Sequence, residues 1–212
     1  MGMKTKLFFA LLFCFAALST HCAQAQTWGS EVAVKVDYFH FTDSQIKSLN
    51  SQDGVYIGLE SYKQLFCPNL YFGMAIGWAG PSGNVSGLVS SAVFLPTFAS
   101  ADSSIDYVPI ELNVKYVIPF SKCFNLAFGA GGSINYFSLT TNITTPGAVG
   151  HFSDSDWVWG GQFFGEMNYK FNNWFIGVDV KYQVTEDLHL FGIDTQAGAD
   201  NLRAGGRIGF TF

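Results

Sequence analysis

The sequence predicts an all-β protein, a transmembrane antiparallel up-and-down β-barrel of about eight strands, and three observations lead to this prediction. Segments of about 9–13 residues alternate between apolar and polar or small residues, as two-faced strands do. Aromatic residues make up 17% of the chain and charged residues only 13%, an unusual balance for a water-soluble domain. Beyond residue 25, no stretch approaches the roughly 18 consecutive apolar residues of a membrane helix, so alternation carries the apolar content.

The alternation marks a strand in each of several segments, and one parity of each segment is strongly apolar. In the first segment, Val32, Val34 and Val36 alternate with Lys35 and Asp37. A tilted strand of about nine to eleven residues crosses the hydrocarbon of a bilayer, and most of the segments reach this length. The later segments are residues 55–60, 70–78, 108–116, 125–136, 157–170, 174–183 and 202–212.

The links between these segments alternate in length, as expected for a barrel with turns at one end and loops at the other. Short links surround Cys67, residues 119–123 and residues 171–173. The long links are rich in Ser, Thr, Gly, Asp and Asn, which predicts four solvated external loops. These long links are residues 42–53, 80–103, 139–156 and 185–200.

The N-terminus has the pattern of a secretory signal peptide. Lys4 and Lys6 precede an uncharged apolar run over residues 7–18, and residues 23–25 supply a small-x-small cleavage site. We therefore expect residues 1–25 to be removed and residues 26–212 to form one barrel domain. Lipidation of Cys22 is disfavoured because His21, before it, is not small. The remaining chain carries nine basic and sixteen acidic residues, which argues against a nucleic-acid partner.

Two cysteines remain after the predicted cleavage, and two alternatives stay open for them. An exported protein meets an oxidising compartment, where a disulfide between Cys67 and Cys123 is favoured. The bond requires Cα atoms within about 7 Å, while strands two positions apart lie roughly 9–10 Å from one another. The bond therefore forms only if the two turns lean together.

Ten charged residues fall on the polar parity and are expected to point into the lumen. A barrel of eight strands has room inside for side chains or one small ligand, and buried charges must be paired. We therefore predict a salt-bridged plug, with a narrow gated pore or a proton relay as the alternative. The ten residues are Asp37, Glu60, Glu111, Glu166 and Asp179, with Lys35, Lys115, Lys181, Arg203 and Arg207.

Two further patterns distinguish a membrane barrel from a soluble β-sandwich. Small residues such as Gly73, Gly77, Gly129 and Gly131 point inward and leave space for long side chains opposite them. Aromatic residues gather at both strand ends, as in the girdles of bilayer-spanning barrels. One girdle comprises Trp28, Tyr116, Tyr169, Trp174 and Phe212, and the other Tyr38, Trp78, Tyr136, Trp157 and Tyr182.

The final strand carries the most specific signal. Residues 202–212 alternate and place Ile208, Phe210 and Phe212 on one face, with phenylalanine last. Together with the barrel pattern over residues 26–212, this resembles the small outer-membrane barrel superfamily of outer-membrane-protein-A-like and opacity-protein-like, porin-family barrels. The resemblance implies residence in the bacterial outer membrane, insertion by the barrel-assembly machinery, and contact with outer-membrane lipid and lipopolysaccharide.

Three classes of function fit such a barrel. We expect a non-enzymatic surface protein that displays its external loops for adhesion, host contact or envelope integrity. A small porin-like channel for ions or solutes is the alternative. An enzyme that modifies lipid A is a third class, for which His40, Asp102 and Ser103 could supply a base, an acid and a nucleophile. No spacing of ligands indicates a metal, and no motif indicates a cofactor.

Overall fold

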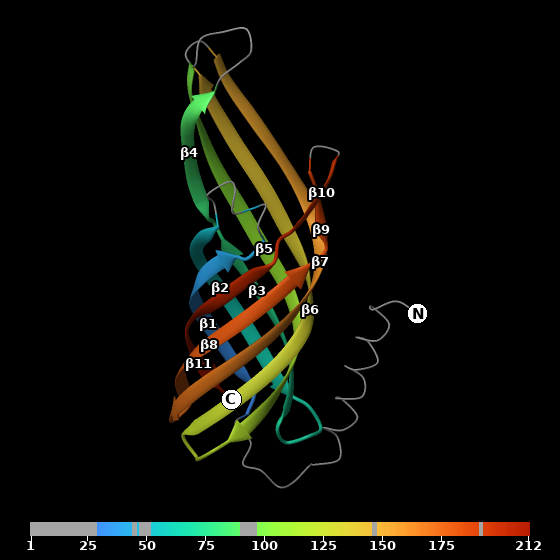
Figure 1. Ribbon diagram of the computed structural model, residues 1–212. Coiled ribbons are helices and arrows are strands. Elements are labelled where there is room, and N and C mark those ends of the chain that lie inside the picture. The colour runs from blue at the N-terminus through green and yellow to red at the C-terminus, as the bar shows by residue number, and fades with distance from the viewer. Residues whose placement is uncertain (1–28, 44–45, 47–51, 90–96, 146–147, 191–192) are drawn as a thin grey trace, which may run out of the picture.

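The computed structural model describes residues 29–43, 46, 52–89, 97–145, 148–190 and 193–212. They form a closed antiparallel barrel whose wall continues on one side as a projecting sheet (Figure 1). The predicted signal peptide and Trp28 lie outside the described residues. Within these residues, no helix is long and apolar enough to cross a membrane. The barrel strands are β1 (Glu31–Phe41), β2 (Asp53–Gln64), β3 (Leu70–Ala79), β5 (Thr97–Pro119), β6 (Phe124–Thr145), β7 (Ala148–Phe171), β8 (Trp174–Thr185) and β11 (Asn201–Thr211).

Every barrel strand pairs with two antiparallel neighbours, so the barrel itself closes without a free edge. β1 pairs with β11 and thereby joins the two ends of the described chain, with Lys35 opposite Arg207. β3 pairs directly with β5, although β4 lies between them in the sequence, and Leu70 is opposite Tyr116. Closure satisfies the backbone hydrogen bonds of the strands internally, which a sheet in contact with lipid requires.

The alternation in the sequence separates the residues that face the lumen from those that face outward. Along β1 the burial alternates at each residue, and Val32, Val34 and Val36 are exposed while Lys35 and Asp37 are buried. The same inversion holds in β2, β8 and β11. A water-soluble barrel would bury its valines, so an apolar outer surface around a charged interior is the arrangement of a barrel in lipid.

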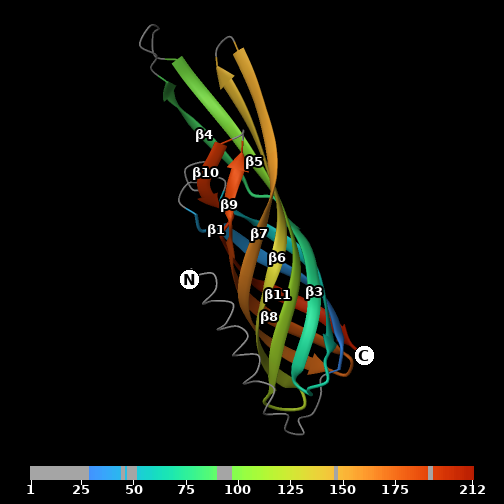
Figure 2. The same ribbon diagram turned by 90° about the vertical axis from the view of Figure 1, so that its right-hand side faces the viewer.

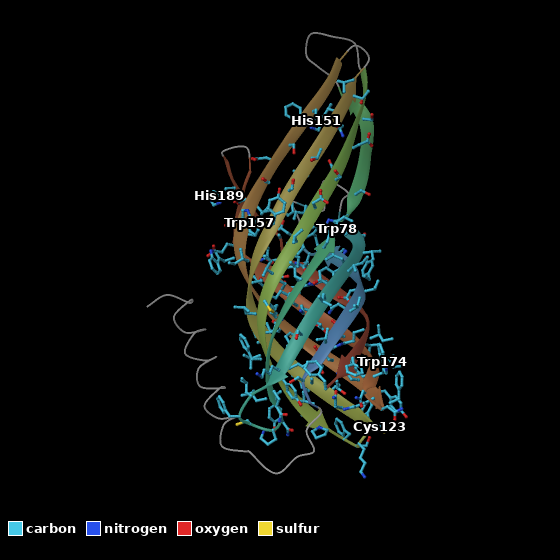
Figure 3. The ribbon with its side chains drawn as sticks, turned by 180° about the vertical axis from the view of Figure 1, so that it is seen from behind. Trp78, Cys123, His151, Trp157, Trp174 and His189 are labelled. Atoms are coloured by element: carbon cyan, nitrogen blue, oxygen red, sulfur yellow. The ribbon has the colours of Figure 1, made fainter. Side chains whose placement is uncertain are left out.

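The two ends of the barrel differ. At the turn end, tight connections join β2 to β3, β5 to β6, and β7 to β8. The connection between β7 and β8 uses Asn172 with φ 56°, a conformation that two-residue hairpins require and asparagine tolerates. Figure 3 places Trp174 and Cys123 at this end, and Trp78 and Trp157 at the opposite end of the barrel, where the projecting sheet begins.

At the opposite end, which we call the sheet end, the prediction of solvated loops is wrong for much of the chain, because strands stand in their place. β5, β6 and β7 are 23, 22 and 24 residues long, about twice the length that crosses a bilayer. Their upper parts and β4 (Ser82–Val89) form a four-stranded extension of the barrel wall, which Figure 2 shows above the barrel. Much of the links 80–103 and 139–156 is therefore regular strand, and link 185–200 contains the hairpin of β9 (Asp187–Leu190) and β10 (Ile193–Gly198).

Hydroxyl side chains explain why these links are strands. Threonine favours strands, and Ser or Thr residues that face one another across strands form hydrogen bonds. Thr140 and Ser153 are such a pair, with 3.2 Å between their hydroxyl oxygens. Ser103 and Thr141 are another, at 3.3 Å. The composition that indicated loops therefore also suits a solvated sheet.

Candidate functional site

The candidate site is the interior of the barrel, where the structure places all ten charged residues expected there. An eleventh, Glu31, joins them and was missed in the sequence. Glu31 has the same parity as Lys35 and Asp37, so extending the alternation of the first strand by one residue would have found it. Together they make six acids and five bases, divided among three clusters that we name after Arg207, Arg203 and Lys35.

The Arg207 cluster comprises Glu31, Glu60, Lys115, Glu166 and Arg207. The Arg207 guanidinium contacts three carboxylates, with 2.7 Å to Glu31, 2.8 Å to Glu60, and an ion pair to Glu166. The Lys115 ammonium lies 2.8 Å from Glu166 and also pairs with Glu31. These five contacts come from strands β1, β2, β5, β7 and β11, so the cluster ties most of the wall together across the lumen.

The other two clusters are smaller. In the Arg203 cluster, Glu111 accepts from Lys181 at 2.5 Å and from Arg203 at 2.6 Å. Arg203 also lies over the Tyr56 ring, 4.5 Å from its centroid. The Lys35 cluster consists of Lys35, Asp37 and Asp179. In this cluster the single ammonium pairs with both carboxylates, at 3.1 Å to Asp37.

Aromatic rings occupy the space that the inward glycines leave. A Cβ atom added to Gly77 would lie 2.3 Å from the Tyr56 ring, and one added to Gly73 would lie 2.3 Å from the Tyr62 ring. The Phe164 ring fills the same space over Gly129. The prediction that small residues face long side chains is therefore met mainly by aromatic rings, which pack the wall tightly.

Amide side chains form a layer between the charges and the sheet end. The hydroxyl of Tyr107 donates to Asn135 Oδ1 at 2.9 Å. Gln183 Nε2 lies 2.8 Å from the same oxygen and 2.6 Å from the Ser133 hydroxyl oxygen. Arg203 donates to Gln183 Oε1 at 2.8 Å, which joins this layer to the Arg203 cluster.

An apolar cap closes the sheet end of the lumen, and sequence reasoning missed it. Phe41 packs against Tyr107 and Phe137, with ring centroids 5.7 and 5.9 Å apart. Leu188 of β9 is also buried in this cluster, at 1% exposure. We define the apolar cap as Phe39, Phe41, Ile46, Tyr56, Ala79, Ile105, Tyr107, Phe137, Leu139, Val158, Leu188 and Ala199.

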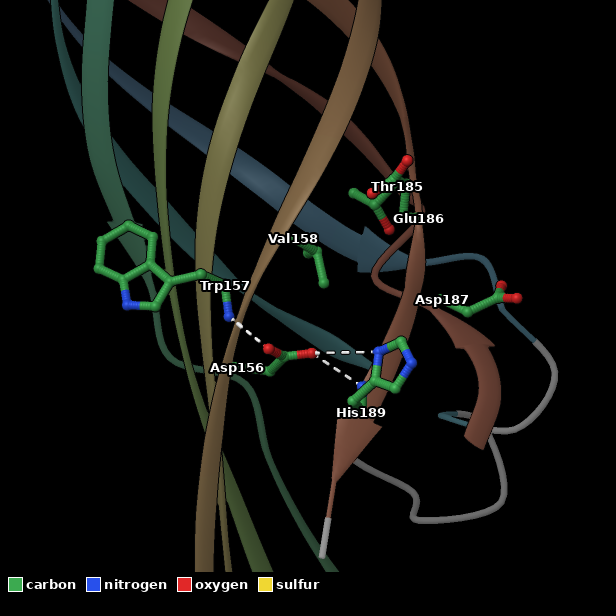
Figure 4. Close-up of a pocket in the computed structure, with 7 residues that line it drawn as sticks. All are labelled: Asp156, Trp157, Val158, Thr185, Glu186, Asp187 and His189. Atoms are coloured by element: carbon green, nitrogen blue, oxygen red, sulfur yellow. Dashed lines mark hydrogen bonds and ion pairs between the residues drawn. The ribbon is translucent and has the colours of Figure 1, made fainter. Parts of the chain in front are cut away.

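The β9–β10 hairpin is attached to the wall beside this cap. Asp156 accepts hydrogen bonds from the backbone N–H groups of Trp157 and His189, both at 2.8 Å (Figure 4). At the base of the hairpin, Asp200 accepts from the Thr185 N–H at 2.7 Å. Burial raises the pKa of Asp200, and this hydrogen bond opposes the rise. A pocket of about 460 Å³ separates hairpin and wall, lined by Asp156, Trp157, Val158, Thr185, Glu186, Asp187 and His189.

The residues considered for an enzyme are not brought together. His40 Nδ1 lies 2.7 Å from Asp53 on the rim between β1 and β2. Asp102 and Ser103 are consecutive in β5 and therefore face opposite sides of the sheet, and Ser103 contacts Thr141. In the described part of the chain, no group of three or more His, Cys, Asp or Glu side chains could hold a metal ion.

Cys67 is buried and Cys123 is exposed, and the structure contains no bond between the two sulfur atoms. The disulfide, one of the two alternatives, therefore stays a prediction. Cys67 lies on the turn after β2 and Cys123 on the turn before β6, with β3 and β5 between them. Unless the two turns lean toward each other, the distance between strands two positions apart exceeds the Cα–Cα distance that a disulfide can bridge.

No known protein-family model matches the sequence, and no curated protein matches it. Among solved structures, Neisserial surface protein A has 11% identity and a TM-score of 0.53, over 87% of this chain and 97% of that one. A major outer membrane protein from Thermus thermophilus has 13% identity and a TM-score of 0.49, covering 86% and 100%. Ail of Yersinia pestis has 10% identity and a TM-score of 0.44, covering 85% and 97%. The likeness to the Neisserial protein shows that this chain has the fold of a small outer-membrane β-barrel.

Proposed function

We propose that the chain is a sealed anchor in the bacterial outer membrane that holds a β-sheet outside the cell for contact with other surfaces. The observation that carries this proposal is the filled lumen. Three charged clusters, an amide layer and the apolar cap follow one another between the two ends of the barrel. A solute would have to displace buried ion pairs and then aromatic rings, each at a cost of several kcal/mol.

The short connections support an orientation with the turn end in the periplasm, and the charges outside the lumen differ between the two ends. Lys63, Lys122 and Lys170 all lie at the turn end. Short turns are periplasmic in barrels of this type. The outward Ile208 and Phe210 lie on β11, and Phe212 follows it directly, where the barrel-assembly machinery would read these residues. Among the described residues, the charged side chains on the rim and the projections at the sheet end are acidic: Asp43, Asp53, Asp102, Asp106, Asp154, Asp156, Glu186, Asp187 and Asp200.

Conductance across a planar bilayer tests the seal. Refolded protein, shown to be folded by a mobility change on boiling, is expected to give no discrete, stable openings. Regular single-channel steps would instead support the alternative of a small porin. Protein that has been boiled before addition is the control for conductance caused by damaged or aggregated chains.

The projecting sheet supports the proposal of surface contact because both of its faces are available. Ile143 and Phe152 lie on the face that continues the lumen wall and are 36% and 50% exposed. The opposite face carries hydroxyl and amide groups, including Thr140, Asn142 and Ser153. Such a sheet raises two different surfaces above the lipid on one rigid support. It can meet apolar as well as polar partners.

A trimmed variant tests this role while leaving the barrel intact. In the register of β6 and β7, Leu139 lies opposite Asp154, so an Asn-Gly turn can replace residues 140–153. Vesicles carrying the full chain are expected to adhere to cultured epithelial cells, and vesicles with the trimmed chain to adhere only as well as empty vesicles. Equal adhesion of both proteins would contradict the role of the sheet.

A further inference from the structure

The buried charges of the lumen do not balance. Among the described residues, the buried acidic and basic side chains are six carboxyl groups and five cations, since Glu31 adds a sixth acid. A buried charge without compensation is costly in a medium of low dielectric constant, and a carboxyl group relieves this cost by taking up a proton. One positive charge beyond the eleven side chains is therefore needed for a neutral interior.

The Arg207 and Lys35 clusters each hold one carboxyl group more than cations, whereas the Arg203 cluster holds one cation more. The two clusters with an excess differ in how many contacts compensate it. In the Arg207 cluster, three carboxylates share five contacts with two cations, and Glu31 and Glu166 each meet both of them. In the Arg203 cluster, two cations serve one carboxylate. In the Lys35 cluster, by contrast, one ammonium serves both Asp37 and Asp179.

The backbone brings these two aspartates together. Gly205 lies opposite Asp37 in β1 and opposite Asp179 in β8, so the three residues form one row across the strands. A Cβ atom on Gly205 would lie 2.5 Å from Asp37 Oδ1, which shows that the carboxylate leans over the glycine. Oδ1 of Asp37 and Oδ1 of Asp179 are buried and have no hydrogen-bond partner among the described residues.

We propose that Asp37 and Asp179 form a proton-binding site in which the folded barrel holds one proton between the two carboxyl groups. The charged groups around the pair are Lys35 on β1, Glu60 on β2 and Arg203 on β11. A metal cation would have to lie beside the Lys35 ammonium, which repels it. A proton instead converts one carboxylate into a hydrogen-bond donor, and the site becomes neutral with Lys35.

The pH dependence of unfolding tests this site. Aspartate in an unfolded chain releases its proton near pH 4, while the folded barrel keeps the proton at higher pH. From about pH 5 up to the pH at which the folded site loses its proton, the unfolding equilibrium constant of the wild-type chain in urea should therefore rise tenfold per pH unit through this site. In Asp37→Asn no proton is needed, so this tenfold rise should be absent.

Glu31→Gln is the matched control because it removes the same charge from a carboxylate that already meets two cations. This variant should keep the wild-type slope. Equal slopes for Asp37→Asn and the wild type would overturn the proposal. A second result would also overturn the proposal: a barrel that is stable at high pH in a sodium salt but not in a choline salt. The site would then hold a metal ion.

A spectroscopic measurement on the wild-type chain avoids any difficulty in refolding the variants. Between about pH 5 and 7, exposed carboxyl groups are ionised, so the infrared band of a protonated carboxyl group reports a buried acid. We expect this band in the folded wild-type barrel with isotope-labelled aspartate, and we expect its loss on unfolding. Absence of the band throughout this range would overturn the proposal. Asp179→Asn should abolish the band as Asp37→Asn does, since the two groups share the proton.

Discussion

Arg207 is the side chain on which the largest group of buried charges depends. It contacts Glu31, Glu60 and Glu166, and only Lys115 would remain beside them in Arg207→Met. Removing one partner of a buried ion pair costs about 3–5 kcal/mol because the other charge stays buried. We expect the free energy of unfolding in urea to fall by about this amount. Arg207→Lys keeps the positive charge but cannot contact three carboxylates at once, so its free energy of unfolding should lie between those of the wild type and Arg207→Met. An unchanged urea midpoint for Arg207→Met would contradict the role of Arg207 in the cluster.

Gly77 is a position where the structure has no room for a side chain. A Cβ atom there would meet the buried Tyr56 ring at 2.3 Å, whereas the nearest atom to a Cβ on the outward Gly132 is 3.8 Å away. Overpacking a filled interior costs about 1–3 kcal/mol. Gly77→Ala should therefore lower the free energy of unfolding by this amount, and Gly132→Ala should leave it within about 0.5 kcal/mol or raise it. Equal effects at both sites would show that the ring is free to move.

At this scale, the sequence predicts which side of the wall a residue faces but not which residue it contacts. Parity alone placed Glu111 and Arg203 inside. Their pairing depends on register and on the depth of each residue in the barrel, neither of which alternation determines. Glu31 was missed because the apolar alternation was counted from Val32, although its parity already marked it.

At the scale of elements, β9 is the segment that closes the barrel. Leu188 is buried in the apolar cap, while Asp156 holds the backbone of the neighbouring His189. Leu188→Asp would bury a carboxylate among aromatic rings, so the hairpin should detach. We expect the amides of residues 187–190 to lose protection from hydrogen exchange while the barrel keeps its mobility shift on boiling. Leu188→Met conserves the volume and should keep the protection; equal exchange in both variants would contradict the cap.

The strands themselves show where sequence patterns succeed and fail. All eight barrel strands were predicted because lipid on one side and packed side chains on the other impose strict alternation. The extensions of β5, β6 and β7 were not predicted, because a sheet with water nearby accepts Ser, Thr and Asn on its surface. Those residues also suit loops, and only the cross-strand pairing of residues such as Thr140 and Ser153 distinguishes the two structures.

For the whole molecule, the tryptophans provide a test of how the barrel lies in a bilayer. Trp78, Trp157 and Trp174 are 47%, 57% and 50% exposed on the outer surface, near the two ends of the barrel. Tryptophan favours the headgroup level of a bilayer. Lipids brominated near the headgroup should therefore quench its fluorescence more strongly than lipids brominated at the chain end. Single-tryptophan variants separate the two ends, and the absence of quenching by either lipid would contradict a membrane-spanning barrel.

The projecting sheet also has a consequence for the plane of the membrane. A barrel with equal loops is nearly round when viewed along its axis, so every direction within the membrane is equivalent for it. Here the sheet of β4 to β7 rises far above the rim, and the hairpin of β9 and β10 rises less, which gives the molecule a front and a back as well as a top and a bottom. Neighbouring proteins and sugar chains therefore meet a wall on one side and an open approach on the other. Rotation about the membrane normal thus decides what the sheet can reach.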